Sequence, residues 1–337
     1  MAVMTYAQAG CLALRQEMER DQRVWALGED VGPDGGVAGQ YLGLRERFGP
    51  GRIVDTPISE SMIMAAAIGS SLLGMRPVAE LRYADFALCA ADEIINQAAK
   101  ARYMLGGQVQ VPIVIRQPMG MRWGMAAQHS QSLENLWVGT PGLVVVATAT
   151  PADNHGLLKA AIRADDPVVF LEHKELWLET GEVDEGAGPL AIGQAAVRRS
   201  GADITLVSWS STANACVAAA AQLAGEGIDA EVIDLRTLWP WDRDTVFASV
   251  RRTGRVLVAH ESTRVGGFGG EVLAEIAEAL FGQLKAPPRR LGSPRIPVPY
   301  SKPLEDLCRV GPDRIAAAAA ALCRGGAAPG MPELAPG

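Results

Sequence analysis

The chain has 337 residues, of which 48% are hydrophobic and 20% charged, and its formal net charge is −7. This acidic balance argues against nucleic acid as the main partner, because phosphate binding needs a basic surface. No apolar run is long enough for a membrane-spanning helix, and residues 1–16 lack the pattern of a signal peptide. Five scattered cysteines, never in CxxC spacing, fit a reducing compartment and argue against a structural zinc site. We therefore expect a cytoplasmic protein that binds no nucleic acid, no membrane and no metal ion of its own.

The hydrophobic pattern of the first half predicts strands that alternate with helices. Strands are predicted at 24–27, 53–54, 76–81, 111–116, 143–147 and 168–172. Helices are predicted at 4–20, 60–73, 92–105 and 151–164. This alternation is typical of an α/β fold, in which a mostly parallel sheet is flanked by helices.

A polar, acidic and Gly-rich stretch at 179–189 interrupts the alternation, and we interpret it as a linker. Beyond it the alternation returns. Strands are predicted at 204–208, 230–234 and 255–260, and helices at 211–225, 270–280 and 314–323. The predicted organisation is a first domain at 1–182, a linker at 183–189, a second domain at 190–324 and a disordered tail at 325–337, which is rich in Gly, Pro and Ala.

The helix predicted at 60–73 has no polar face beyond serine. A helix that is apolar all round is expected to be buried on all sides. Its small residues allow another backbone to approach closely. A subunit interface would provide such burial, and so would a large core.

The segment 55–60, Asp-Thr-Pro-Ile-Ser-Glu, places the Glu60 carboxylate in the first turn of this apolar helix. A buried carboxylate is costly without a partner. No Lys or Arg lies within one helical turn of Glu60. We therefore expect another group to meet it, and a cofactor nitrogen is our hypothesis.

Histidine is scarce, and His129 is the most suggestive of the four. It lies in a polar patch after a loop rich in Gly and Met. It could be a loop histidine hydrogen-bonded to the backbone, or a proton donor or anion contact, since histidine titrates near neutrality. His173 and His260 each follow a predicted strand and are secondary candidates, because parallel sheets bind ligands at the carboxyl ends of their strands.

Several common motifs are absent. The glycines at 266–270 lack the third glycine of a dinucleotide-binding fingerprint, so a turn that begins the next helix is favoured. No phosphate-binding loop, serine-hydrolase elbow or HExxH zinc motif occurs. The chain also has no Gly-Asp-Gly followed by Asn.

The sequence resembles the beta subunits of the thiamine-diphosphate-dependent, decarboxylating component of 2-oxo acid dehydrogenase complexes. That group includes pyruvate, branched-chain 2-oxo acid and acetoin dehydrogenases. The matching segments lie at 28–31, 55–60, 74–80, 83–86, 96–100, 102–107, 129–132, 140–143, 157–163 and 266–269.

The resemblance implies two transketolase-like domains, each a mostly parallel sheet flanked by helices. The first would bind the aminopyrimidine ring of thiamine diphosphate, and the second would serve mainly in assembly. In this family an alpha subunit holds the diphosphate and Mg²⁺ through Gly-Asp-Gly and Asn. The chain would thus share the cofactor with an alpha subunit in an alpha2beta2 heterotetramer, with a lipoyl acyltransferase core as a further partner.

The resemblance also assigns roles to four residues. Glu60 matches the acid that hydrogen-bonds N1′ of the aminopyrimidine and promotes its active tautomer. Phe86 matches the aromatic ring that packs on the aminopyrimidine. His129 matches the loop histidine that reaches the substrate carboxylate, and Glu29 matches an acidic residue in the passage between paired active sites.

The implied activity is that of a dehydrogenase acting on a 2-oxo acid or acetoin, with acyl transfer to a lipoyl acceptor. Two alternatives stay open: a split transketolase-like carboligase that forms acyloins, and a non-catalytic assembly subunit. Gln128 and the Glu172-His173-Lys174 run look closer to acetoin dehydrogenase chains. Arg122, Trp123, Cys89 and Arg295 depart from common family patterns and leave the substrate open.

Overall fold

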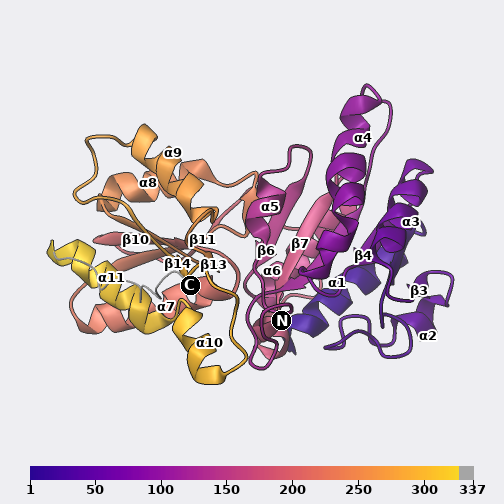
Figure 1. Ribbon diagram of the computed structural model, residues 1–337, viewed down its shortest axis with the longest axis horizontal. Helices are drawn as coiled ribbons and strands as arrows, with labels where there is room; N and C mark the ends of the chain where they lie inside the picture. The colour runs from indigo at the N-terminus through magenta and orange to yellow at the C-terminus, as the bar shows by residue number, and fades with distance from the viewer. Residues whose placement is uncertain (326–337) are drawn as a thin grey trace. The chain divides into compact units, whose positions relative to one another are not determined.

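The computed structural model describes residues 1–325, which divide into two compact units (Figure 1). The N-terminal unit comprises Met1–Met119, Leu136–Ile192 and Leu238–Pro240. The C-terminal unit comprises residues 120–135, 193–237 and 241–325. Nearly all of the predicted tail, residues 326–337, lies outside the described part. Within residues 1–325, no helix has both the length and the apolar character needed to cross a bilayer.

A seven-stranded sheet forms the centre of the N-terminal unit, in the order β12-β6-β7-β5-β4-β2-β3. All neighbouring pairs from β6 to β3 are parallel. The strands are β2 (Val24–Gly28), β3 (Ile53–Asp55), β4 (Arg76–Glu80), β5 (Val114–Met119), β6 (Val144–Thr148), β7 (Val168–His173) and β12 (Thr237–Trp239). Strands β5 and β7 are buried throughout, because helices cover both faces of the sheet. The predicted α/β architecture of this half is confirmed.

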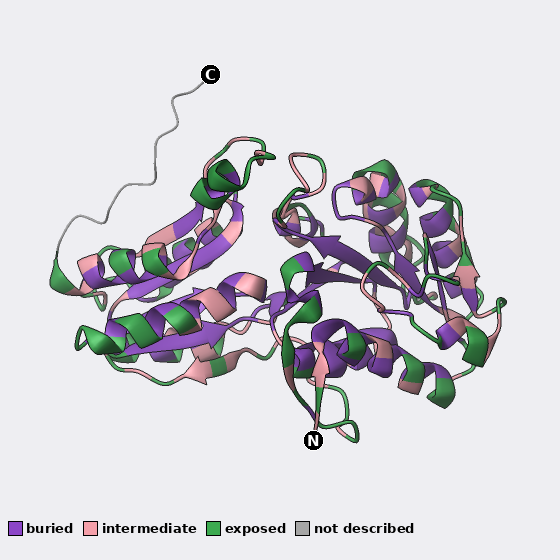
Figure 2. Ribbon diagram, turned by 90° about the horizontal axis from the view of Figure 1, so that it is seen from below, coloured by how far each residue is buried: buried purple, intermediate pink, exposed green. Residues whose placement is uncertain are grey.

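Helices lie on both sides of this sheet (Figure 2). On one face α1 (Tyr6–Arg20) packs against α6 (Pro151–Arg163), and their apolar residues share a core with Ala26, Val78 and Phe170. On the other face lie α3 (Glu60–Leu72), a π-helical turn (Glu93–Ala98) and α4 (Ala99–Met104). The single helix predicted at 92–105 is therefore a π-helical segment continued by a short α-helix.

Helix α3 is not buried on all sides, contrary to the expectation from its composition. Ile63, Met64 and Ala67 are fully buried against the sheet. On the opposite side, Met62 is 46% exposed and Leu73, at the end of the helix, is 87% exposed. An apolar helix face is thus open within the described chain.

The predicted linker at 179–189 begins with a strand. β8 (Thr180–Val183) pairs antiparallel with β1 (Ala2–Thr5). Residues 4 and 5, predicted as helical, belong to β1, and α1 begins at Tyr6. Thr5 caps α1, since its hydroxyl accepts from the Gln8 amide while the Gln8 side chain accepts from the Thr5 amide.

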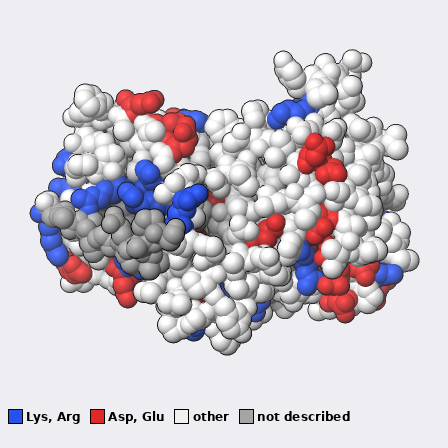
Figure 3. Space-filling model, in the orientation of Figure 1, with Lys and Arg blue, Asp and Glu red and all other residues white. Residues whose placement is uncertain are grey.

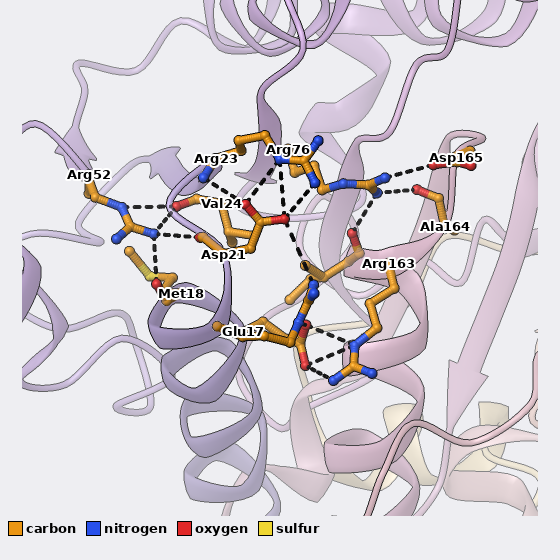
Figure 4. Close-up of polar contacts among 12 residues, drawn as sticks. Glu17, Met18, Asp21, Arg23, Val24, Arg52, Arg76, Arg163, Ala164 and Asp165 are labelled. Atoms are coloured by element: carbon orange, nitrogen blue, oxygen red, sulfur yellow. Dashed lines mark hydrogen bonds and ion pairs between the residues drawn. The ribbon is translucent and has the colours of Figure 1, made fainter.

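Two arginines satisfy the carbonyl ends of α1 and α6, at the edge of the sheet where β2 and β4 begin (Figure 4). Arg76 donates to the carbonyls of Ile162 (3.1 Å) and Ala164 (2.8 Å) and pairs with Asp165 (2.7 Å). Arg52 donates to the carbonyls of Met18 (3.0 Å) and Asp21 (3.1 Å). The last carbonyls of a helix lack partners within the helix, and these guanidinium groups supply donors to two of them at the end of each helix.

At the opposite end of the sheet, where the parallel strands terminate, charged side chains form a buried ionic network. Arg116 of β5 is fully buried and binds Glu172 of β7 through two hydrogen bonds of 2.7 and 2.8 Å. Glu80 of β4 lies 3.7 Å from Arg116 and accepts a hydrogen bond from the Tyr41 hydroxyl at 2.8 Å. The Tyr41 ring stacks near the Arg116 guanidinium, 4.9 Å from it. The network holds the ends of three strands together.

The C-terminal unit contains a five-stranded sheet in the order β14-β13-β10-β11-β9, parallel except for the β9–β11 pair. Helices α7 and α11 share a core cluster with one face, and α8 and α9 contact β10 and β13. The strands are β9 (Ala196–Arg199), β10 (Ile204–Ser208), β11 (Ala230–Asp234), β13 (Val256–Thr263) and β14 (Arg289–Ser293). The helices are α7 (Ser210–Gly225), α8 (Arg243–Thr253), α9 (Gly269–Ala279), α10 (Lys302–Cys308) and α11 (Pro312–Arg324).

This second unit confirms the predicted mostly parallel sheet flanked by helices. The sequence analysis did not predict α8, α10, β9 or β14. On the face seen in Figure 3, Lys and Arg side chains gather in a strip over this unit. The net negative charge of the chain is therefore not spread evenly over its surface.

Candidate active site

Glu60 is the first residue of α3 and is only 8% exposed. The loop from β3 delivers it there: the Thr56 amide donates to the Gly28 carbonyl (2.9 Å), and the Asp55 carboxylate accepts from the Gly32 amide (3.2 Å). No basic side chain forms an ion pair with Glu60 within the part of the chain that the structure describes. The predicted burial of this carboxylate is thus observed.

Glu29 follows directly after β2, and the fold brings it close enough to Glu60 for their charges to interact. Burial raises the pKa of the Glu29 carboxyl, and the negative charge of Glu60 raises it further. Glu29 Oε1 is buried and has no hydrogen-bond partner in residues 1–325. The preceding Gly28 has φ +153°, and a Cβ there would lie 2.6 Å from the Glu80 carbonyl oxygen. Only glycine therefore allows β2 and β4 to approach so closely at this edge.

Phe86 begins a 3₁₀ turn (Phe86–Ala90) that follows β4. Its amide donates to the Tyr83 carbonyl at 2.8 Å. The end of the turn is tied to the start of α3, because the Ser61 hydroxyl donates to the Cys89 carbonyl at 2.8 Å. The half-buried Phe86 therefore belongs to a turn that packs against the end of α3 carrying Glu60.

Unpartnered polar atoms near the ends of these strands bear on whether a polar cofactor ring fits here. Besides Glu29 Oε1, the Thr56 hydroxyl and both amide atoms of Gln117 are buried without a partner in the described residues. Buried polar groups are normally hydrogen-bonded. Unpaired donors and acceptors of this kind, on residues at or after the ends of β2, β3 and β5, are the chemistry that the edge of an aminopyrimidine could complete.

The sequence analysis did not single out Thr56 or Gln117. Thr56 lay within the Glu60 segment without a role of its own. Gln117 was not considered because the predicted strand ended at residue 116, whereas β5 continues to Met119. Only its burial with unpaired amide atoms identifies it. No group of three or more His, Cys, Asp or Glu side chains in residues 1–325 is arranged to hold a metal ion.

His129 lies in the C-terminal unit, in the long segment between β5 and α5 (Glu134–Val138). It is half-buried, and its amide donates to the Ala126 carbonyl at 3.4 Å. Glu29, Glu60 and Phe86 belong to the N-terminal unit. The structure thus groups the three cofactor candidates and places the histidine on the other unit.

The two secondary candidates, His173 and His260, form contacts that have structural roles. His173 Nδ1 accepts from the Glu175 amide (3.2 Å) and caps the 3₁₀ turn Lys174–Leu178. His260 is fully buried, stacks on Trp209 with ring centroids 5.3 Å apart, and is hydrogen-bonded through Nδ1 to the hydroxyl and the carbonyl of Ser262. Burial lowers the pKa of His260 to about 4. A Cβ on Gly267 or Gly269 would lie 2.5 Å from its ring, so these glycines make room for the buried imidazole.

Comparison with known proteins defines the class. Residues 2–178 match the transketolase pyrimidine-binding domain, and residues 193–315 match the transketolase C-terminal domain. Among solved structures, a split-gene transketolase described as an inactive beta4 tetramer superposes with a TM-score of 0.78 at 23% identity, covering 95% of this chain and 98% of that one. At that identity the likeness bears on the fold alone. The two units are those of the transketolase class.

Relatives of known name give a finer placement. The 2-oxoisovalerate dehydrogenase subunit beta of Bacillus subtilis is 44% identical over 94% of this chain and 98% of its own length. The acetoin:2,6-dichlorophenolindophenol oxidoreductase subunit beta of Cupriavidus necator is 46% identical over 93% and 96%. The pyruvate dehydrogenase E1 subunit beta of Bacillus subtilis is 41% identical over 90% and 93%. The chain belongs to the family of beta subunits of the thiamine-diphosphate-dependent 2-oxo acid and acetoin dehydrogenases.

Proposed function

We propose that this chain activates the aminopyrimidine of thiamine diphosphate through Glu60, for the oxidative cleavage of a 2-oxo acid or acetoin and acyl transfer to a lipoyl acceptor. The observation that carries the proposal is the buried Glu60 at the start of α3, close enough to Glu29 for their charges to interact, with Glu29 Oε1 buried and unpartnered within residues 1–325. A carboxyl group that donates a hydrogen bond to a ring nitrogen must be protonated. Burial and the nearby negative charge raise the pKa of Glu29, which favours a proton in this part of the site.

Three residues of the N-terminal unit have different roles in binding the aminopyrimidine ring. Glu60 would form the hydrogen bond to N1′, with the carboxyl group of Glu29 nearby. Phe86 offers an aromatic surface to the flat face of the ring. Once bound, the cofactor contributes a thiazolium that serves as the electron sink for breaking a carbon–carbon bond.

His129 is assigned to the substrate. A neutral or protonated imidazole can contact a carboxylate and can donate or accept a proton near neutral pH. The relatives' names include pyruvate, 2-oxoisovalerate and acetoin as their compounds. We extend that class, small 2-oxo acids and acyloins, to this chain.

A partner is part of the proposal, because the chain lacks the Gly-Asp-Gly and Asn that would hold a diphosphate and Mg²⁺. We assign both groups to an alpha subunit in an alpha2beta2 assembly, with a lipoyl acyltransferase as the acceptor. The open apolar face of α3, with Met62 and Leu73 exposed, supports burial by another subunit. All five cysteines are free, as expected in a reducing cytoplasm.

The two alternatives have less support. The named relatives above are called dehydrogenases or oxidoreductases, which disfavours a carboligase. Glu60, Phe86 and His129 are all present, and a silent assembly subunit would need none of them.

The test uses this chain with its alpha partner and the Glu60→Gln variant. Glutamine keeps the size and a donor N–H but has no acidic proton, so turnover with pyruvate, 2-oxoisovalerate or acetoin should fall on the order of 10²–10⁴-fold. Dye reduction reports the dehydrogenase, and a stable ketol product would report the carboligase instead. Glu278→Gln, at an exposed carboxylate of α9, is the matched control and should retain wild-type turnover. Unchanged turnover in Glu60→Gln would refute the proposal.

A further inference from the structure

The segment that carries His129 is attached to the C-terminal unit at both of its ends by one carboxylate. Glu261 Oε1 accepts a hydrogen bond from the Met121 amide at 2.7 Å. The same oxygen accepts from the Ser132 hydroxyl at 3.0 Å. Within the segment, the Gly120 amide donates to the Gln131 carbonyl at 3.1 Å, so its two ends lie side by side. Residues 121–132 therefore form a closed loop, which we call the histidine loop.

The strand that carries Glu261 is buried and well packed. Glu261 lies on β13 between two buried residues, His260 and Ser262. The His260 ring is stacked on Trp209 and bonded to Ser262, which fixes this part of the strand. A side chain held on a strand of a packed sheet can position a loop more accurately than another loop can.

The chain just after the histidine loop is attached to the same region. Glu134 is buried and accepts from the Trp209 indole N–H at 3.2 Å. The Asn135 amide group donates to the Gly266 carbonyl at 3.2 Å. Trp209, Glu261 and Gly266 all belong to the C-terminal unit. The loop bearing His129 thus depends on that unit for its conformation.

We propose that Glu261 is the positioning residue of the histidine loop: by closing residues 121–132 on one carboxylate oxygen, it sets where His129 meets the substrate. The inference rests on the role proposed for His129. It gives the C-terminal unit a part in catalysis beyond assembly. In this proposal Glu261 acts on catalysis through the loop, by its hydrogen bonds to Met121 and Ser132.

The physical reason is the freedom of an unanchored loop. Ordering a segment of this length costs conformational entropy, and contacts at both ends offset much of that cost. A displacement of about 1 Å at a reacting group can cost on the order of 100-fold in rate. Loss of both hydrogen bonds should therefore lower catalysis while leaving cofactor binding intact, because Glu29, Glu60 and Phe86 lie in the N-terminal unit.

The experiment is a double-mutant cycle in the complex with the alpha partner. The variants are Glu261→Ala, His129→Ala, the double variant, the rescue variant Glu261→Gln, and Glu278→Ala as the exposed control. We expect Glu261→Ala to lower kcat/KM about 10- to 100-fold. Glu261→Gln, whose amide oxygen can still accept both hydrogen bonds, should recover most of that loss. In the His129→Ala background, Glu261→Ala should cause little further loss, since residues that act as a unit are not additive.

Hydrogen exchange supplies a readout independent of activity. In Glu261→Ala, peptides covering residues 120–135 should exchange faster, while peptides of α7 in the same unit should not. If Glu261→Ala does not fold, Ser132→Ala removes one of the two bonds and should show the same pattern at smaller amplitude.

The outcomes separate the two claims. If His129→Ala leaves kcat/KM unchanged, the substrate role of His129 fails, and the inference about catalysis fails with it. Two other outcomes leave the proposed function standing but overturn the positioning role. In the first, His129→Ala is impaired while Glu261→Ala is fully active. In the second, the losses in kcat/KM caused by the two single substitutions simply multiply in the double variant. Unchanged exchange over residues 120–135 would also overturn it.

Discussion

Buried carboxylates in this protein differ chiefly in what each one faces. Glu172 is fully paired with Arg116. Glu80 lies farther from that arginine and takes a hydrogen bond from Tyr41. Glu29 interacts electrostatically with a second carboxylate, Glu60, and its buried Oε1 has no partner within residues 1–325. Of these three carboxylates it is therefore the one left incompletely satisfied, as expected where another molecule completes a binding site.

Glu80 offers a test of this electrostatic description. Burial raises the pKa of its carboxyl to about 7, outweighing the opposite effect of Arg116. A carboxyl whose pKa is higher in the folded than in the unfolded state stabilises the fold fully at pH below the unfolded value. That contribution is lost as the pH rises through the folded value. The free energy of unfolding of the wild type, relative to Glu80→Gln, should therefore fall between about pH 5 and pH 8.

Urea denaturation of the purified chain over that pH range measures this difference, with Glu278→Gln as the exposed control. A difference that stays flat, or grows with pH, would show that Glu80 is ionised in the folded state throughout.

At the scale of elements, the ends of helices decide how α1 and α6 are fixed to the sheet. Their first turns are capped by Thr5 and Thr150. Carbonyls in their last turns accept hydrogen bonds from Arg52 and Arg76 (Figure 4). Arg52 directly precedes β3, and Arg76 is the first residue of β4. Each guanidinium therefore joins a helix end to the edge of the sheet opposite the candidate site.

Arg76→Met should lower the free energy of unfolding by about 1.5–3 kcal/mol, because it leaves carbonyls of Ile162 and Ala164 without their charged donor. Arg23→Met is the matched control: Arg23 is 57% exposed and forms an ion pair with Asp21, two residues away. That change should cost less than about 1 kcal/mol. Equal losses in the two variants, measured by urea denaturation, would contradict the capping role.

For the molecule as a whole, the open side of α3 is the feature that a single chain does not explain. Met62, Leu72 and Leu73 are exposed there together with the small residues Ala65 and Gly69. Small residues permit close approach of another backbone, and large apolar residues favour its burial. A subunit interface accounts for both.

Gly69→Leu tests whether a partner covers this face. A Cβ at Gly69 meets nothing within 4 Å, so the folded chain should accommodate the larger side chain. Assembly with the alpha partner should weaken by at least about tenfold, roughly 1.4 kcal/mol. Light scattering after size-exclusion chromatography measures the assembly, and circular dichroism checks the fold. Gly225→Leu, at the end of α7 with nothing within 4 Å, is the control. Normal assembly of Gly69→Leu would exclude this face as the interface.

Local pattern was enough for much of the fold. Apolar runs in β2, β4, β6, β7, β10 and β11 and the periodicity of α6, α7 and α11 predicted these elements within a few residues, because burial on one or both faces imposes a short-range period. The same pattern placed Glu60 at the start of an apolar helix. The polar edge strand β14 and the short strand β8 were not predicted. Their strand conformation depends on pairing with β13 and β1 and is not indicated by their own composition.

Sequence by itself therefore determined the alternation of strands and helices, the family and the candidate residues, all of which depend on neighbours along the chain. Only the tertiary structure decided which distant groups meet. It put Glu29 close enough to Glu60 for their charges to interact, bound Arg116 to Glu172 across 56 residues, and closed the histidine loop on a carboxylate 140 residues from Met121. Such contacts follow from the packing of whole elements, which no local period encodes.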